Sequence, residues 1–573
     1  MDYKKQYEFW LTDDYFDAAT KAELAAIQED DAEIQDRFYK DLAFGTGGLR
    51  GVLGAGSNRM NIYTVRKATQ GLADYIIEQQ GQQKGIAIAY DSRRFSPEFA
   101  LETALCMAAN GIKAYLFDSL RPTPELSFAL RSLGCIAGVV ITASHNPPEY
   151  NGYKVYWEDG AQITAPRDQE IIARVNAVTQ YSAVKTMDKD AAQKAGLLVS
   201  IGAEIDDAYM AALKQQILHP EILKEAAGAL KIVYSPFHGT GNVPVCRILK
   251  ELGFTQVYVV KEQELPDPDF TTLEYPNPED PKAFTLALEL ARRVDADVVL
   301  ATDPDADRLG IYAKDSKTGT YIPFTGNMSG MLICEYILRE RTALGKMPVN
   351  PAIVSTIVTT NMAAVIAKEY GVHFIEVLTG FKYIGEQIKF FEEQGTYQYV
   401  FGLEESYGCL AGTHARDKDA VVAVMCLCEV AAWCKAKGIT LWDKMCELYE
   451  KYGYFKESQY TITLKGMDGS RQIQAIMDKL RKETPKYLGD RKVLAVRDYL
   501  TGKRVDLCTG EEKDMTLPKS NVLYFELPRD FWCCARPSGT EPKIKFYMGV
   551  KGNSIEESER MLEELTEAVK ALI

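Results

Sequence analysis

The chain has 573 residues, of which 46% are hydrophobic and 25% are charged, a composition typical of soluble globular proteins. This length exceeds one hydrophobic core and predicts three to five domains. The net charge of −14 argues against nucleic acid as a main partner, because phosphates favour basic surfaces, but it leaves room for small anionic ligands in a local basic cleft.

The sequence contains no apolar run as long as a membrane span, and its first residues, MDYKKQYEFWLTDDYFD, lack the apolar core of a signal peptide. We therefore expect a cytoplasmic protein with no membrane partner. The twelve cysteines are too few for a disulfide scaffold in this length, and none of their spacings is typical of zinc. We expect buried thiols in a reducing compartment.

Short apolar runs alternate with helical patterns through most of the chain, as expected of α/β units with mixed or parallel sheets. The first 44 residues are helical and charged and are expected to decorate the first domain. The segment 97–111 has helical spacing and ends on a glycine. Buried strands are expected in three sets: 85–91, 113–118 and 136–144; 230–241, 255–260 and 296–308; 351–358, 372–380 and 397–408.

The last part of the chain has a different pattern. Residues 459–466 alternate, 470–483 form an amphipathic helix, 543–550 read as a strand, and 554–573 read as another helix. This pattern predicts a separate α+β domain. With joints near residues 205, 322 and 453, the predicted domains are 1–205, 206–322, 323–453 and 454–573.

Polar residues follow several of the predicted strands, where ligands bind in open α/β sheets. Ser144 follows the strand VVIT, and the run DPDADR, from Asp303 to Arg308, follows DVVLAT. Four further candidates occupy equivalent places: Glu404, Ser406, Thr379 and Lys382. We expect these residues to line one site.

The run DPDADR places Asp303, Asp305 and Asp307 at alternating positions of a tight turn. Alternation can aim several carboxylates at one hard cation such as Mg²⁺ or Ca²⁺, although an acidic loop with a capping aspartate is the plainer interpretation. The run is not an EF-hand, and it lacks the DxDxT pattern of haloacid-type phosphatases. Arg308 beside the carboxylates indicates an anion next to the cation.

Two other turns are candidate ligand sites. RPSGTEPKIKF combines Arg536, Ser538, Gly539 and Thr540 with Lys545 behind them, which together could hold a phosphate, although a plain loop is an equally good interpretation. FGTGGLRG carries Arg50 on a glycine-rich segment but lacks the ending of a P-loop, and a structural turn is its simpler interpretation.

His145 adjoins Ser144, so a serine hydrolase has to be considered. The GxSxG elbow of such enzymes is absent around Ser144. His219 and His373 are expected to be structural.

Four motifs occur in the order found in the α-D-phosphohexomutases: TASHNP (142–147), DPDADR (303–308), GLEESYG (402–408) and RPSGTEPK (536–543). Over nearly its full length the chain resembles this family, and it is most similar to the long branch that includes bacterial phosphoglucomutases and phosphopentomutase-like enzymes. The resemblance implies four domains around a central cleft, each giving one loop to the site.

By the same motif match, Ser144 is expected to carry a phosphoryl group. The resemblance implies that Asp303, Asp305 and Asp307 bind Mg²⁺ together with the phosphorylated Ser144. Further roles follow: Arg308 holding that phosphate; Glu404 and Ser406 binding sugar hydroxyls; Arg536, Ser538, Gly539 and Thr540 holding the non-reacting phosphate; and Arg50, His145 and Lys154 lining the reacting end, with Lys154 a candidate general acid/base.

The implied reaction interconverts glucose 1-phosphate and glucose 6-phosphate through a glucose 1,6-bisphosphate intermediate that turns over in the cleft. In-line transfer needs neutralised charge, which the metal, Arg308 and Lys154 would supply. Related alternatives are a phosphopentomutase, a bisphosphate synthase, a non-catalytic phosphosugar sensor and a serine phosphohydrolase. A monomer and a dimer are both compatible with the sequence.

The chain departs from phosphomannomutase-like members at Gly408, where they often have a histidine. The segment THARDKDA could supply the missing cations through His414, Arg416 and Lys418. A helix start with solvated charges is the competing interpretation.

Overall fold

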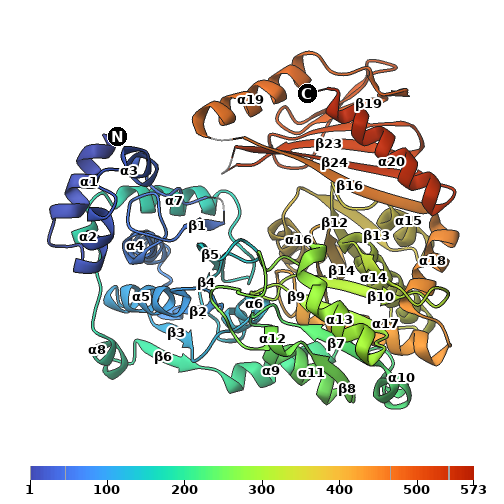
Figure 1. Ribbon diagram of the computed structural model, residues 1–573, viewed down its shortest axis with the longest axis horizontal. Helices are drawn as coiled ribbons and strands as arrows, with labels where there is room; N and C mark the ends of the chain where they lie inside the picture. Colours follow the sequence, from blue (N-terminus) through green and yellow to red (C-terminus); the bar gives the residue numbers. More distant parts are fainter. Residues whose placement is uncertain (1, 46, 465, 540–541, 573) are drawn as a thin grey trace.

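The computed structural model describes residues 2–45, 47–464, 466–539 and 542–572. Four main sheets follow one another along the chain, and we name the units built on them the first (48–201), second (203–324), third (326–452) and fourth (454–570) unit. Figure 1 shows the first unit on one side of the molecule and the fourth unit above the third. No helix among the described residues is both long and apolar enough to cross a membrane.

Three short helices precede the first unit, as the sequence predicts. They are α1 (Tyr3–Thr12), α2 (Ala18–Ala25) and α3 (Asp31–Phe38). Their apolar faces surround Trp10, which is fully buried and stacks on Phe16 with ring centroids 4.2 Å apart. Tyr63 of the next helix closes this cluster, so burial of aromatic area attaches the extension to the first unit.

The first unit contains a six-stranded mixed sheet in the order β1-β5-β4-β2-β3-β6. Strands β2, β3, β4 and β6 pair in parallel, whereas β5 pairs antiparallel with β4 and β1. The strands are β1 (Gly48–Val52), β2 (Ile86–Tyr90), β3 (Ala114–Phe117), β4 (Ala137–Ile141), β5 (Tyr150–Trp157) and β6 (Leu198–Ile201). The helices are α4 (Ile62–Glu78), α5 (Ser96–Ala109), α6 (Thr123–Ser132), α7 (Arg167–Ala177) and α8 (Lys189–Lys194).

The second unit contains a five-stranded mixed sheet in the order β11-β10-β9-β7-β8. Its strands are β7 (Lys231–Ser235), β8 (Gln256–Val259), β9 (Val298–Thr302), β10 (Leu309–Lys314) and β11 (Tyr321–Phe324). Its helices are α9 (Ala203–Lys214), α10 (Pro220–Ala226), α11 (Asn242–Glu251), α12 (Lys261–Glu264) and α13 (Thr285–Val294).

The third unit contains a four-stranded mixed sheet in the order β13-β12-β14-β15. Its strands are β12 (Pro351–Thr356), β13 (His373–Val377), β14 (Gln398–Glu404) and β15 (Gly408–Ala411). Its helices are α14 (Gly326–Ala343), α15 (Met362–Glu369), α16 (Phe381–Gln394), α17 (Ala420–Ala436) and α18 (Leu441–Tyr452).

The fourth unit contains an antiparallel sheet in the order β16-β24-β23-β22-β19-β20-β21. Its strands are β16 (Tyr454–Thr463), β19 (Ala495–Asp498), β20 (Lys503–Asp506), β21 (Glu512–Asp514), β22 (Leu523–Glu526), β23 (Trp532–Pro537) and β24 (Lys543–Gly552). Its helices are α19 (Gly466–Lys482) and α20 (Ile555–Lys570), and β17 (Tyr487–Leu488) pairs with β18 (Arg491–Lys492). The expected fold class, three α/β units and a C-terminal α+β unit, is confirmed.

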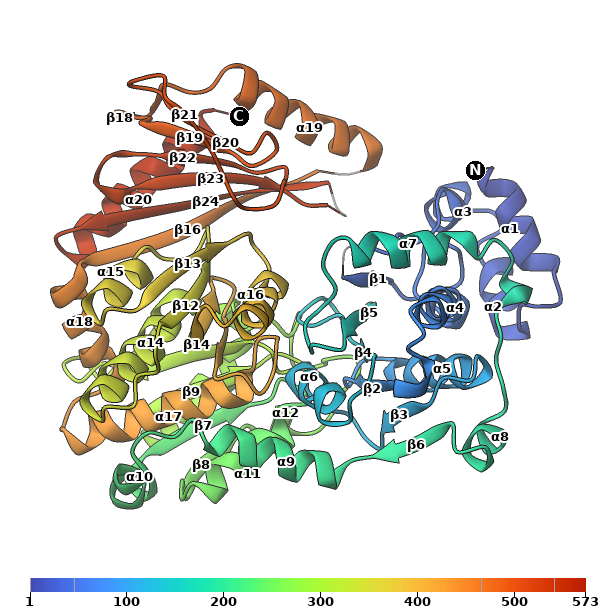
Figure 2. The same cartoon turned by 180° about the vertical axis from the view of Figure 1, so that it is seen from behind.

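One apolar core runs through both the second and the third unit. It joins Leu300 of β9, Met331 of α14, Val354 of β12 and most of α17. Helix α17 is apolar on nearly all sides and contacts β9 and β10 of the second sheet as well as β15 of the third. Figure 2 shows this long helix beside β7 and α10. Because an all-round apolar helix has to be covered on every side, α17 ties the two units together.

All cysteines are free, and most are buried, whereas Cys508 is exposed. The expectation of buried thiols is therefore confirmed for most of them.

Candidate active site

Ser144 lies three residues beyond the end of β4, in the loop to β5, and only 3% of it is exposed. Its φ of 53° is in the left-handed region, which costs a non-glycine residue roughly 1–3 kcal/mol. Its hydroxyl donates a hydrogen bond to Asp303 Oδ2 at 2.8 Å and lies 3.2 Å from His145 Nδ1. The strained backbone therefore aims this oxygen at the acidic loop of the second unit.

The acidic loop begins directly after β9 and turns back on itself at Ala306, whose φ is 51°. Asp303 Oδ1 accepts hydrogen bonds from the backbone N–H groups of Asp307 (3.1 Å) and Arg308 (3.0 Å). These bonds hold the turn, so the two later carboxylates face the same point. The DPDADR turn predicted from the sequence is thus a closed loop rather than an extended acidic run.

Asp303, Asp305 and Asp307 each offer an oxygen within 4.8 Å of the others, and all three are buried. Oδ1 of Asp305 and Oδ1 of Asp307 are buried and have no hydrogen-bond partner among the described residues. Unsatisfied buried carboxylate oxygens are costly unless a cation neutralises them. Oxygen ligands at this separation suit a hard divalent cation, so the residues present fit a metal site.

Lys154, on β5, reaches across to the acidic loop. Its Nζ lies 2.7 Å from Asp305 Oδ2 and 3.6 Å from Asp307 Oδ2. Burial lowers the pKa of Lys154, but the two carboxylates outweigh burial and raise it above its ordinary value. For Asp305, burial alone would raise the pKa. The Lys154 ammonium outweighs burial and lowers the pKa of this carboxyl below its ordinary value, so it is ionised.

Burial and the neighbouring carboxylates raise the pKa of Asp303 well above its ordinary value. His145 shows the opposite sign, because burial and then the charges of Arg308 and Arg50 lower its pKa well below the ordinary value. The imidazole is therefore neutral near pH 7 and can accept or donate a hydrogen bond beside the serine hydroxyl.

Lys418 also belongs to this group. Its Nζ lies 3.1 Å from Asp307 and 3.6 Å from Glu404, and its side chain is 11% exposed. The interpretation of THARDKDA as a helix start with solvated charges is wrong for Lys418, because two facing carboxylates hold this lysine inside the protein. His414 and Arg416 point elsewhere: His414 Nε2 lies 2.7 Å from Asp419, and Arg416 binds Glu392 and the Thr413 carbonyl.

The candidate sugar loop follows β14. Ser406 donates a hydrogen bond to Glu404 Oε1 at 2.8 Å, and Tyr407 has a φ of 66°. Gly326, at the start of α14, supports this loop closely: a Cβ there would lie 2.5 Å from both the Glu405 carbonyl oxygen and the Tyr407 nitrogen. The loop therefore depends on a glycine in a different element.

Thr379 and Lys382 follow β13, as the sequence predicts. Thr379 Oγ1 is buried without a hydrogen-bond partner among the described residues. Burial lowers the pKa of Lys382, the carboxylates of Asp168 and Glu386 oppose this effect, and the charge of Arg536 lowers it further. The structure thus brings the third-unit candidates within electrostatic reach of the fourth unit.

Of the fourth-unit candidates, Arg536 lies on β23 and pairs with Lys545 on β24, and Ser538 and Gly539 follow β23. The Ser538 backbone N–H donates a hydrogen bond to the Lys543 carbonyl at 2.7 Å, and Lys545 Nζ donates one to Gln459 Oε1 at 3.1 Å. Gly539 is exposed, and Thr540 lies outside the described residues. Burial lowers the pKa of Lys545, which leaves a cation with a reduced hydration shell on β24.

Two arginines flank the serine and acidic loops. Arg50, on β1, is exposed, and its Nη1 donates a long hydrogen bond of 3.4 Å to Asn146 Oδ1 in the serine loop. Arg308 Nη1 binds Glu279 Oε1 at 2.7 Å, and its Nε lies 3.8 Å from Asp307 Oδ1. Both guanidinium groups can approach an anion attached to Ser144.

Sequence reasoning missed Thr123 at the start of α6. Its hydroxyl donates a hydrogen bond to Asp305 Oδ2 at 2.8 Å, and its backbone N–H donates one to the Asp305 carbonyl at 2.9 Å. Thr123 therefore joins the first unit to the acidic loop. The only signal in the sequence was the segment RPTPE after a predicted strand, which is common in ordinary helix starts.

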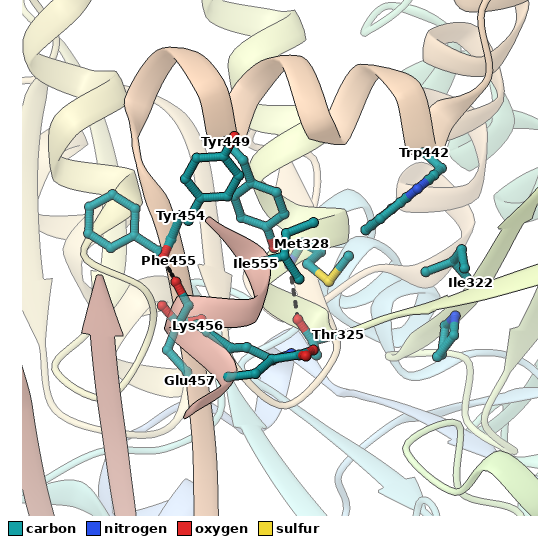
Figure 3. Close-up of a pocket in the computed structure, with 13 residues that line it drawn as sticks. Ile322, Thr325, Met328, Trp442, Tyr449, Tyr454, Phe455, Lys456, Glu457 and Ile555 are labelled. Carbon is teal, nitrogen blue, oxygen red and sulfur yellow. Dashed lines mark hydrogen bonds and ion pairs between the residues drawn. The ribbon is translucent and has the colours of Figure 1, made fainter. Parts of the chain in front are cut away.

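A cavity of about 380 Å³ lies away from these residues, where the end of the second unit meets the third and fourth units. Figure 3 shows the rings of Trp442, Tyr449 and Tyr454 around it, with Met328 and Ile555. None of the candidate residues above lines it.

Three regions of the chain match domain families. Residues 41–182 match "Phosphoglucomutase/phosphomannomutase, alpha/beta/alpha domain I", residues 207–318 match domain II, and residues 325–452 match domain III of the same description. A protein named phosphoglucomutase from Staphylococcus epidermidis is 38% identical over 519 residues, which are 90% of this chain and 92% of that protein. One from Staphylococcus aureus is 37% identical over 524 residues, which are 91% of this chain and 92% of that protein.

Solved structures agree at the level of the fold. A putative phosphomannomutase from Thermus thermophilus superposes with a TM-score of 0.68 at 21% identity, covering 93% of this chain and 99% of that one. The parafusin phosphoglucomutase from Paramecium gives a TM-score of 0.67 at 17% identity, covering 93% of this chain and 96% of that one. With three domain families matched in order and two relatives above 35% identity along most of their length, this chain belongs to the phosphoglucomutase/phosphomannomutase family, the α-D-phosphohexomutases, and is an enzyme of that family.

Proposed function

We propose that this enzyme interconverts glucose 1-phosphate and glucose 6-phosphate, with Ser144 as the residue that carries the phosphoryl group. The observation that carries the proposal is the 2.8 Å hydrogen bond from the Ser144 hydroxyl to Asp303, inside a buried group of three carboxylates. A serine placed there can pass a phosphoryl group to and from a sugar hydroxyl. Glucose 1,6-bisphosphate is the intermediate and the activator.

Asp303, Asp305 and Asp307 would hold Mg²⁺ together with the serine oxygen. When bound, this cation would neutralise charge on the transferring phosphoryl group. The chain's own cations act from two sides. Lys154 approaches from the first unit and Lys418 from the third, and both lie within 3.1 Å of a carboxylate of the acidic loop.

We assign proton transfer to Lys154 and orientation of the serine hydroxyl to His145. Asp305 holds the Nζ of Lys154, and the lysine side chain is 13% exposed, so Nζ can exchange a proton with a substrate hydroxyl in a site sheltered from water. His145 Nδ1 lies 3.2 Å from the serine oxygen and would orient it. Arg308 and Arg50 would hold the phosphoryl oxygens.

Binding of the rest of the substrate falls to the third and fourth units. Glu404 and Ser406 would accept and donate hydrogen bonds to sugar hydroxyls, with Thr379 and Lys382 beside them. The non-reacting phosphate would bind the turn after β23. The residues that would hold it are Arg536 on β23, Ser538 and Gly539 after this strand, Lys545 on β24, and Thr540.

The test is a coupled assay with Mg²⁺ and a trace of glucose 1,6-bisphosphate, comparing glucose 1-phosphate with ribose 1-phosphate. We expect the wild type to prefer the hexose. Ser144→Ala should abolish turnover and leave the unfolding midpoint unchanged. The matched control is Ser132→Ala, an exposed serine at the end of α6, which should leave turnover intact.

A preference for the pentose would keep the mechanism and make the enzyme a phosphopentomutase. Steady release of inorganic phosphate without isomerisation would indicate a phosphohydrolase. Absence of turnover with both sugars, or full activity in Ser144→Ala, would contradict the proposal.

A further inference from the structure

Arg93 lies between β2 and α5 and is 1% exposed. Its Nη1 donates hydrogen bonds to the carbonyl oxygens of Pro147 (2.8 Å) and Tyr150 (3.1 Å). Its Nη2 donates to those of Ser144 (2.6 Å) and Asn146. One guanidinium group therefore donates hydrogen bonds to four carbonyl groups of a single short loop.

That loop, residues 142–150, is the one that presents the Ser144 hydroxyl. It contains two prolines, which donate no backbone hydrogen bond, and it lies outside any sheet ladder except at its last residue. Four of its carbonyl oxygens accept hydrogen bonds from Arg93. The left-handed φ of Ser144 is part of this conformation, so Arg93 supports a backbone that the loop's own sequence does not favour.

The other face of Arg93 contacts the second unit. The guanidinium lies 5.0 Å from the centroid of the Phe270 ring, and Phe270 is fully buried. The neighbouring Arg94 forms an ion pair with Asp269 in the same segment. Asp91 Oδ2, 3.4 Å from Arg93 Nε, is its counter-ion. Arg93 thus connects the serine loop with the unit that carries Asp303.

We propose that Arg93 is a positioning residue for phosphoryl transfer, which sets the place of the Ser144 hydroxyl relative to the acidic loop by binding the carbonyl oxygens of the serine loop. This inference rests on the proposed role of Ser144. Arg93 is 1% exposed and its hydrogen bonds go to the backbone of the loop, so we expect it not to touch the substrate. Its loss should therefore lower the rate of transfer and leave substrate affinity largely unchanged.

A lysine cannot replace it. The guanidinium is planar and directs its N–H groups outward in a fixed fork, whereas a lysine ammonium is a single point on a flexible stem. Arg93→Lys retains the charge beside Asp91 but can serve fewer of the four carbonyl groups at once. The conservative substitution therefore separates the effect of charge from the effect of geometry.

The experiment compares Arg93→Lys and Arg93→Ala with the wild type, using the assay above and a urea unfolding curve for each protein. The matched control is Arg59→Lys, a buried arginine of the same unit that binds the Asp36 carboxylate and the backbone carbonyls of Asp36 and Asn58 instead of those of the serine loop. For Arg93→Lys we expect kcat to fall about a hundredfold with KM within about threefold of wild type, since small misplacements act on the transition state. Arg59→Lys should change neither constant.

Single-turnover transfer from the phosphorylated enzyme to glucose 1-phosphate should slow by the same factor as kcat in Arg93→Lys. Guanidinium chloride at millimolar concentration should raise the transfer rate of Arg93→Ala about tenfold, because the free guanidinium ion can occupy the space of the missing group. The same salt should have no effect on Ser144→Ala. A folded Arg93→Lys with kcat within about threefold of wild type would overturn the proposal.

Substitution of a buried arginine can prevent folding, so Phe270→Leu provides a second route. It leaves every hydrogen bond of Arg93 in place and removes only the ring against the guanidinium. We expect a fall in kcat of about threefold or more at unchanged KM; wild-type kcat in this variant would overturn the link between Arg93 and the second unit. Failure of the wild type to turn over would count against the proposed function instead, independently of Arg93.

Discussion

At the scale of single residues, some side chains of the site can be recognised in the sequence and others cannot. Ser144 and the three aspartates stand in motifs, at the ends of apolar strands, and could be selected from the sequence. Arg93 and Thr123 could not, because their partners are a backbone and a loop distant in the chain. For Lys418 the sequence left two interpretations open, a cation of the site or a solvated charge at a helix start. A sequence does not show which charges face each other across a fold.

The aspartate loop predicts a metal-dependent gain in stability. Mg²⁺ at a hundredfold excess over its dissociation constant should stabilise the wild type by about 2.7 kcal/mol, and Asp305→Asn should lose this gain together with activity. Melting temperatures with MgCl₂ and with EDTA measure it. Asp297→Asn, which removes a carboxylate paired with Lys435 before the same strand, is the control and should keep the gain. An equal gain in Asp305→Asn would contradict the metal site.

Glu405 predicts a pH dependence. Burial, and then the charge of Glu404, raise its pKa from 4.5 to about 7. Between these values the unfolded chain has lost the proton and the folded chain keeps it, so stability from this group falls as pH rises through the window. The wild type should lose on the order of 2 kcal/mol from pH 4.5 to 7 relative to Glu405→Gln, measured by urea unfolding. Glu289→Gln, at an exposed position of α13, should follow the wild type.

At the scale of elements, strand and helix positions were predicted well because apolar runs and helical spacing are local properties. The predicted strand 136–144 is β4 followed by the serine loop, and the predicted helix 97–111 is α5. The support of one element by another was beyond the sequence. Gly326 begins α14, yet its lack of a side chain serves the loop after β14, and no local pattern links the two.

Gly326→Ala tests this support. The added methyl group would lie 2.5 Å from backbone atoms of the sugar loop, so the loop has to move. We expect kcat/KM for glucose 1-phosphate to fall roughly ten- to a hundredfold, mainly through KM if the loop binds the sugar. Thr342→Ala, near the other end of α14, should keep wild-type kinetics. Unchanged KM in Gly326→Ala would separate this loop from sugar binding.

At the scale of the whole molecule, four units follow each other along the chain, as the sequence predicts, and the domain limits at 205, 322 and 453 remain predictions. What composition and periodicity could not reveal is that the second and third units share one core. The apolar face of a helix shows that it is covered, but not by which part of the chain. The all-round apolar pattern of α17 was the one local sign of such an arrangement.

The shared core predicts joint unfolding. Leu332→Ala, in α14, should cost roughly 2–5 kcal/mol and should speed hydrogen exchange equally in β9 of the second unit and β12 of the third. Leu562→Ala, in the separate core of the fourth unit, should speed exchange there only. Faster exchange in β12 with β9 unaffected would show that the two units open independently.

The position of α17 also matters while the chain is being made. The second sheet is complete in sequence at Phe324, but the helix that covers part of it begins only at Ala420. At ordinary rates of synthesis the ribosome needs on the order of ten seconds to produce the intervening segment. During that interval the nascent chain presents an uncovered apolar surface, so this protein should depend on chaperone binding to the growing chain more than its modest unit sizes would suggest.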